Sequence, residues 1–207
     1  MDDRLELELL VAQLERMRAM LFGYSSLFFA RIRDWAIVAI VLLVLGASGL
    51  VPVAIVLVPF VVPFAFLETG YLFYYTVFAR RHAERLERAI NERAGHDVLA
   101  AHRLEAAYFY EPDAPKIAAF SVARPLGFMS AVTLGYSFGA LLLWLGGIVG
   151  LVDFVGSLDE PGLMALAVPG ALVWTAAIVV YLLWTFLRRP DERRLLEALE
   201  ASYRSRS

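Results

Sequence analysis

Residues 35–79 read WAIVAIVLLVLGASGLVPVAIVLVPFVVPFAFLETGYLFYYTVFA and contain no lysine or arginine. A helix needs about 20 apolar residues to cross the hydrocarbon core of a bilayer, so this stretch is long enough for two crossings and a turn. A second block without lysine or arginine, residues 125–187, supplies one crossing at 125–152 and another at 161–187. The sequence therefore predicts an all-α membrane protein with four transmembrane helices and helical cytoplasmic extensions.

The positive charges predict how these helices are oriented. All 19 lysines and arginines lie in residues 4–33, 80–124 and 188–206. Cytoplasmic loops are enriched in lysine and arginine, so both termini and the central loop are predicted to be cytoplasmic. The second outer loop instead carries Asp153, Asp159 and Glu160. We expect a multi-pass protein of the plasma membrane, which in bacteria is the inner membrane.

This pattern divides the chain into five segments. They are a cytoplasmic heptad helix (1–33), a transmembrane hairpin (34–80), a cytoplasmic helical segment (81–124), a second transmembrane hairpin (125–189) and a cytoplasmic tail (190–207). The turn of the first hairpin has two candidate positions, the glycine-rich residues 46–52 or residues 57–59. Proline removes a backbone donor and crowds the preceding turn, so Pro59 and Pro63 should bend the second crossing, and Pro169 the fourth.

The N-terminal segment carries apolar residues at alternating spacings of three and four, which is a heptad seam. Three interpretations of this seam stay open: packing against helices of the same chain, a coiled coil between subunits, or a helix on the lipid surface. As a seam for an oligomer or a protein partner, its members are Leu7, Leu10, Leu14, Met17 and Leu21.

The central cytoplasmic segment also has helical patterns. No breaker occurs between the second crossing and Gly95, so that helix should continue out of the membrane, with an apolar stripe that includes Leu86 and Ile90. A further helix is expected at about residues 97–110, ended by Pro112 and Pro115. Residues 116–123 are expected to form a short segment at the membrane surface.

Glu68 is the only aspartate, glutamate, lysine or arginine inside the four predicted crossings. It precedes Arg80 by about 18 Å of helix, which places it near the middle of the bilayer. Charged groups there are costly, so Glu68 should face protein or water, with tyrosine and threonine hydroxyls as its expected partners. A pore or ion-binding site and a glutamate that only joins helices are equally favoured. The candidate pore or ion-binding residues are Glu68, Tyr71, Tyr75, Thr133 and Tyr136.

The third crossing carries small residues at intervals that allow helix backbones to approach closely. We interpret them as helix-packing positions, within one subunit or between subunits. They are Ala131, Gly135, Gly139, Gly146 and Gly150.

Several function classes lack their usual sequence features. The chain has no cysteine and no phosphate loop, dinucleotide fingerprint, serine elbow or zinc-binding histidine pair, so we expect no enzyme, cofactor or metal site. Glu92 with His96, and His102 with Glu105, are spacings that a solvated helix produces by chance. The cytoplasmic arginines alternate with glutamates, which argues against a nucleic-acid surface.

Two functions are favoured over a third, a transporter with a substrate site in the helical bundle. The first is a homo-oligomeric channel-like protein, selective for cations or protons if it conducts, with Glu68 in the membrane interior. The alternative is a non-conducting membrane scaffold or accessory subunit that binds a protein partner through its cytoplasmic helices. Membrane lipids are expected contacts in both cases.

Overall fold

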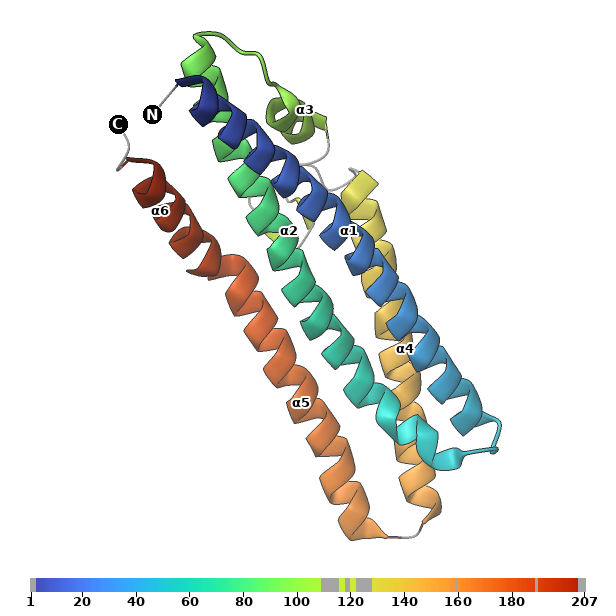
Figure 1. Cartoon of the computed structure of the whole chain (residues 1–207). Coiled ribbons are helices and arrows are strands. Elements are labelled where there is room, and N and C mark those ends of the chain that lie inside the picture. The colour runs from blue at the N-terminus through green and yellow to red at the C-terminus, as the bar shows by residue number, and fades with distance from the viewer. Residues whose placement is uncertain are drawn as a thin grey trace.

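The computed structural model of the chain describes residues 3–108, 116–117, 120–121, 128–158, 160–188 and 190–204. Within these residues the structure is helical apart from turns and one small hairpin, which confirms the predicted helical class (Figure 1). The helices are α1 (Asp3–Ala47), the 3₁₀ helix η1 (Pro52–Leu57), α2 (Val58–Ala94), α3 (Ala101–Tyr108), α4 (Phe128–Ser157), α5 (Pro161–Arg188) and α6 (Pro190–Arg204). In the segment expected at the membrane surface, β1 (Lys116–Ile117) pairs antiparallel with β2 (Phe120–Ser121).

Three helices of the described chain are long and apolar enough to cross a membrane: η1 with α2, α4, and α5. The first predicted crossing lies in α1, which is not among them. Arg31, Arg33 and Asp34 interrupt the apolar stretch of α1. The apolar part after them, residues 35–47, is only about 20 Å long. The fourth crossing and the orientation of the termini therefore stay predictions.

α1 and α2 lie antiparallel and side by side (Figure 1). The turn between α1 and η1 covers Ser48–Val51, where Gly49 adopts φ 76°, a left-handed conformation that glycine accepts without a steric cost. The turn is therefore at the first of the two predicted positions. The alternative near residues 57–59 is wrong, because η1 leads there directly into α2.

The prolines of the second crossing are not equivalent. Pro59 lies in the first turn of α2, where a helix has no intrahelical partner for the missing N–H. The prediction that Pro59 bends this helix is therefore wrong for the described structure. Pro63 is inside α2, and Pro169 is inside α5, as the sequence predicts.

α2 continues past its apolar part to Ala94 and ends at Gly95, whose φ of 72° gives a left-handed C-cap. This confirms the predicted helix that runs without a break out of the apolar zone. α3 begins at Ala101, later than the expected residue 97, because residues 98 and 99 form hydrogen bonds with the side chain of Asn91 instead.

The heptad seam of α1 packs on α2 of the same chain. Leu10, Leu14 and Met17 are buried there against Ala83, Leu86 and Ile90. Leu7 stays exposed and Leu21 is half-buried. The interpretation as packing within one chain is therefore the correct one, and the three buried residues are not available to a second subunit.

The other ends of the helices meet around η1. Ile55 of η1 lies where a Cβ on Gly46 of α1 or on Gly150 of α4 would be. Val58 takes the corresponding place beside Gly147. Backbone approach at these glycines lets η1 fill the space between α1 and α4.

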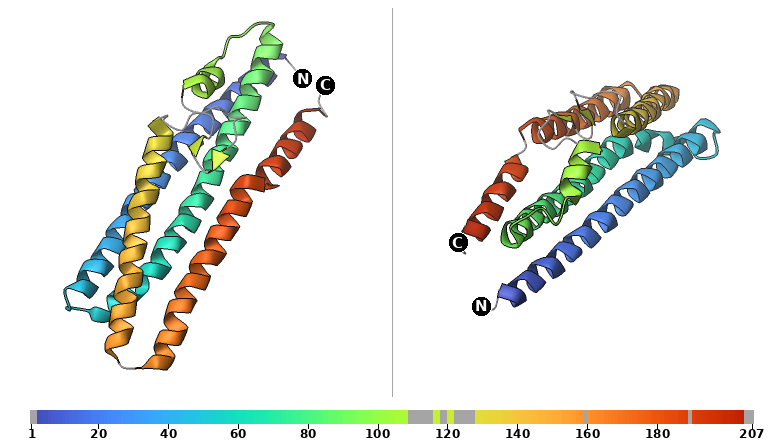
Figure 2. Two further views of the ribbon diagram at one scale, coloured as in Figure 1. Left: turned by 180° about the vertical axis from the view of Figure 1, so that it is seen from behind. Right: turned by 90° about the horizontal axis from the view of Figure 1, so that it is seen from above.

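α6 occupies part of the segment expected to be a tail. It lies beside α2, with Leu199 buried and Glu192 bound to Arg81 of α2 (Figure 1). Seen from above, α2 lies between the N-terminal half of α1 and helix α6 (Figure 2).

Candidate functional site

Glu68 binds two side chains of α1. Its carboxylate accepts a hydrogen bond from the indole Nε1 of Trp35 and forms an ion pair with Arg31, whose Nε lies 3.7 Å from Oε1. Among the described residues no hydroxyl contacts it. The expectation of hydroxyl partners, and of no basic residue at that depth, is therefore wrong. The antiparallel register of α1 and α2 brings Arg31 to the level of Glu68, which is not visible from the separate segments.

The contacts between helices show where this group lies relative to the charged ends of α2 and α5. Gly70, just after Glu68, packs against Leu182 of α5, and Leu182 precedes Arg188 by about 9 Å of helix. Along α2 itself, Arg80 is about 18 Å away from Glu68. Arg31 therefore lies well inside the zone that is apolar on α2 and α5, and not at the level of Arg80 and Arg188.

Aromatic residues of α1 continue on the N-terminal side of Arg31. Tyr24 stacks on Tyr75 with ring centroids 5.0 Å apart, and Met20 packs against the buried cluster that α1 and α2 share. Arg31, Arg33 and Asp34 thus have a stretch of α1 without charged residues on either side, residues 19–30 and 35–47. We name Arg31, Arg33, Asp34 and Glu68 the polar belt.

In a single chain, the side chains of the polar belt are partly exposed on the outer surface of the helices. The exposed fraction of the side chain is 30% for Glu68, 48% for Arg31 and Asp34, and 70% for Arg33. Arg33 and Asp34 form their own ion pair, with 3.0 Å between Nη2 and Oδ1. The belt contains two cations and two anions, and each charge has a counter-charge within the chain.

Tyr71 and Tyr75 lie on α2 on the C-terminal side of Glu68. Their hydroxyl groups are joined by a hydrogen bond of 2.6 Å, and Tyr71 is exposed. Thr133 and Tyr136 are on α4, half-buried and exposed respectively, whereas both contacts of Glu68 go to α1. The structure thus brings Tyr71 and Tyr75 together but joins neither Thr133 nor Tyr136 to Glu68.

The small residues of α4 separate into two groups. Gly146 faces Leu43 of α1, and Gly150 faces Ile55 of η1. Gly147, which the spacing argument missed, faces Val58. Around Gly135 and Gly139 no described atom lies within 4 Å of a Cβ position, and Ala131 is exposed, so this half of the stripe has no packing partner in the described chain.

A second polar group joins α1, α2 and α3 outside the apolar part of the chain. Glu87 of α2 is only 2% exposed and accepts hydrogen bonds from Arg18 of α1 and from the backbone N and Nδ1 of His102 in α3, at 2.6, 3.1 and 2.9 Å. One turn further, Asn91 binds the backbone of residues 98 and 99. Burial raises the pKa of Glu87, but these hydrogen bonds outweigh burial and hold its pKa below the ordinary value.

The sequence contained a signal for this group. Glu87 and Asn91 lie four residues apart beside the apolar stripe of Leu86 and Ile90, on the side of α2 that becomes buried. The alternation of arginine and glutamate along this helix predicts an exposed, salt-bridged surface. For Glu87 that prediction is wrong, because α1 and α3 cover it.

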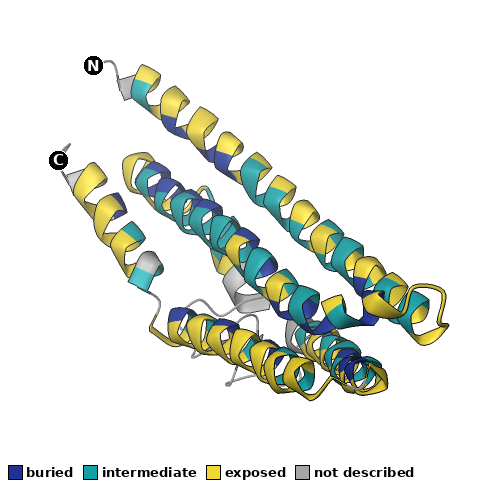
Figure 3. Ribbon diagram, turned by 90° about the horizontal axis from the view of Figure 1, so that it is seen from below, coloured by how far each residue is buried: buried dark blue, intermediate teal, exposed yellow. Residues whose placement is uncertain are grey.

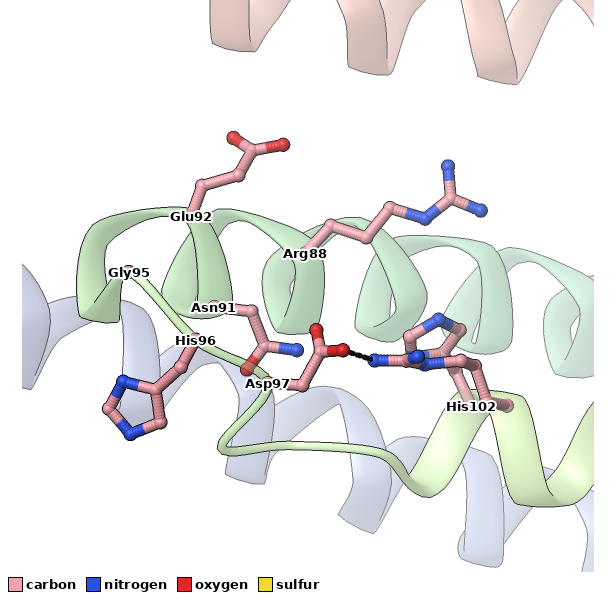
Figure 4. A pocket seen from close by; sticks show the side chains of 8 residues that line it. Arg88, Asn91, Glu92, Gly95, His96, Asp97 and His102 are labelled. Carbon is pink, nitrogen blue, oxygen red and sulfur yellow. Dashed lines mark ion pairs between the residues drawn. The ribbon is translucent and has the colours of Figure 1, made fainter.

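An open pocket of about 610 Å³ lies next to this group, where α2 ends and the chain turns towards α3 (Figure 4). Its lining residues are Arg88, Asn91, Glu92, Gly95, His96, Asp97, His102 and Arg103. The Arg103 guanidinium pairs with Asp97 and holds the pKa of that carboxyl below its usual range. The described residues contain no group of three or more histidines, aspartates and glutamates able to hold a metal ion.

The fold and these sites define an all-helical chain with three helices that can cross a membrane. A comparison with protein-family models, curated proteins and solved structures finds no match. The features that bear on function are therefore the polar belt and the polar group around Glu87.

Proposed function

We propose that the chain is a channel-like membrane protein in which copies assemble and the polar belt lines a water-filled path between them. The observation that supports this proposal is the lateral exposure of the belt at apolar depth. Ionisable side chains at such depth face the interior of a bundle or a water-filled cavity, because exposure to lipid costs about 2.5–3.5 kcal/mol each on insertion scales. An assembly of copies around the belt removes this cost.

The ion pair changes the selectivity expected of such a path. A ring of carboxylates favours cations. Here Arg31 lies 3.7 Å from Glu68 and offsets much of that preference. The path should therefore be only weakly selective, and a substitution at either partner should shift selectivity in a direction set by the charge that remains.

Reversal potentials across a planar bilayer with a salt gradient test this proposal. Glu68→Gln leaves Arg31 unbalanced and should shift selectivity towards anions, whereas Arg31→Gln should shift it towards cations. Glu8→Gln is a matched control, because Glu8 lies in an exposed ion pair near the N-terminus, far from the belt in sequence. The absence of current from the parent protein, at any voltage and together with a monomeric mass in detergent, would falsify conduction.

A second candidate is a membrane scaffold that presents its cytoplasmic helices to a protein partner. The observation that favours it is the buried group around Glu87 and Asn91, which fixes α3 and the adjoining pocket on the α1–α2 hairpin. Under this hypothesis Glu68→Gln leaves function unchanged. Arg103→Ala, at the exposed edge of the pocket, should instead weaken chemical cross-linking of the chain to its partner in native membranes.

A further inference from the structure

α1 has one side that no other part of the described chain covers. Its residues follow one another at spacings of seven, four and three, which places them on one face of a helix. We name this set the outer face of α1: Phe22, Phe29, Arg33, Ile37, Ile40 and Val44, all of them exposed. It is about 33 Å long, close to the thickness of the hydrocarbon core of a bilayer. Figure 3 shows the exposed positions along this helix.

The middle of the outer face carries the charge. Arg33 is the most exposed member of the polar belt, and its partner Asp34 lies at the edge of the same face. Arg31 points the other way, towards Glu68 of α2. An exposed ion pair between two apolar half-faces needs a polar cover, because lipid tails offer no hydrogen bond or counter-charge.

One charged group remains that can cover the Arg33–Asp34 ion pair. The apolar blocks of α4 and α5, residues 131–152 and 161–187, contain no aspartate, glutamate, lysine or arginine. Glu68 of α2 is already bound to Arg31 and Trp35. At this depth, the complement that remains for Arg33 and Asp34 is the same pair on another copy of the chain.

We propose that a second copy docks on the outer face of α1 about a two-fold axis normal to the membrane. The two α1 helices then run parallel, and Arg33 of each copy pairs with Asp34 of the other. A two-fold contact is self-complementary, so one such pair of residues satisfies both copies. This inference rests on the assembly that we propose above. It places Arg33 and Asp34 in the contact between copies, which leaves Arg31 and Glu68 of the polar belt to line the path.

Single cysteines test the contact directly, because the chain has no cysteine of its own. A two-fold axis brings equivalent residues of the outer face together, so Val44→Cys and Ile37→Cys should form disulfide-linked dimers in membranes under mild oxidation. Val149→Cys on α4 is the matched control, since Val149 is 68% exposed and Val44 is 58% exposed. We expect several-fold more dimer from Val44→Cys than from Val149→Cys.

A charge exchange separates pairing between copies from pairing within one copy. Arg33→Asp makes residues 33 and 34 both acidic, and Asp34→Arg makes them both basic, so neither variant keeps the internal pair. When differently tagged Arg33→Asp and Asp34→Arg chains are expressed together, each with Val44→Cys, mixed dimers should exceed the half that random pairing gives. Each variant expressed alone should yield several-fold less dimer than the parent chain.

The outcomes distinguish this inference from the proposed function. An oligomeric mass without preferential disulfides at Ile37 and Val44 overturns the α1 contact but leaves the assembly standing. Random pairing of the two charge variants also overturns it. Preferential disulfides together with electrical silence support the contact and contradict conduction, and a monomeric mass in membranes contradicts both.

Discussion

Arg31 gives Glu68 a counter-charge beside the apolar part of α2. The ion pair with Arg31 and the hydrogen bond from Trp35 supply Glu68 with two partners inside the chain. The pair therefore contributes no net charge to its surroundings. Arg33 and Asp34 form a neutral pair in the same way. The polar belt as a whole therefore carries no net charge.

His82 makes a pH-dependent contribution to the α1–α2 hairpin. Its ring lies against Phe78, and its Nε2 is 3.3 Å from the amide nitrogen of Gln13 on α1. Burial lowers the pKa of His82 in the folded chain, so the unfolded chain binds the proton more tightly. The free energy of unfolding should therefore fall as the pH drops from about 6.5 towards the depressed folded pKa.

Unfolding of the purified protein at a series of pH values between about 5 and 8 measures this effect. His82→Gln should remove part of the slope below about pH 6.5. His96→Gln, at an exposed position after α2, should keep the parent slope. If His82→Gln and the parent have parallel curves over that range, His82 is not the group responsible.

At the scale of elements, the contact of α4 with η1 and α2 depends on glycine. A Cβ on Gly147 would lie 2.7 Å from Val58 Cγ1 and 2.8 Å from Val58 Cβ. Val58 is fully buried and β-branched, so it has few alternative conformations. Close approach at this point is one of the contacts that join the second hairpin to the first.

Gly147→Ala should therefore lower the free energy of unfolding by about 1–3 kcal/mol, the usual cost of overpacking. Gly135→Ala on the same helix is the matched control, because nothing described lies within 4 Å of its Cβ position. Replacing glycine by alanine there should leave stability unchanged or raise it by up to about 1 kcal/mol. Equal stability of the two variants in chemical unfolding would contradict the close contact.

At the scale of the whole molecule, the N-terminal, central and C-terminal parts meet along α2. α1 packs on it through the heptad seam, and α6 is held by Arg81, whose Nε and Nη2 lie 3.0 and 2.8 Å from Glu192. Burial lowers the pKa of Arg81, but Glu192 and Glu84 outweigh burial and raise it, so the guanidinium stays charged. Both ends of the chain are thus tied to one helix that continues into the apolar zone.

Glu192→Gln replaces the carboxylate of a half-buried ion pair by an amide, which costs about 1–3 kcal/mol. This substitution should therefore release α6 from α2. Trypsin should then cleave at Arg193 and Arg194 several-fold faster than in the parent. Glu197→Gln, on the exposed side of α6, is the control and should not change the rate. Cleavage at equal rates in all three proteins would mean that Arg81 does not hold α6.

Local pattern alone was sufficient for the helical class, three of the apolar helices and several boundaries. The end of α2 at Gly95 follows from a glycine that accepts a left-handed backbone, whereas the turn after residue 47 was one of two positions that the sequence left open. The uninterrupted exit of α2 from its apolar part follows from the absence of a breaker. These features depend only on residues that are close together in the sequence.

Only the tertiary structure decided which residues surround Glu68, Glu87 and the heptad seam. Arg31 and Glu68 are brought together by the register between two antiparallel helices, and periodicity within each helix carries no information on that register. Glu87 is buried because α1 and α3 both cover it. Long-range contacts of this kind depend on how helices pack against one another. Because of that packing, Arg31, Arg33 and Asp34, which the sequence places before the first crossing, lie beside the apolar part of α2.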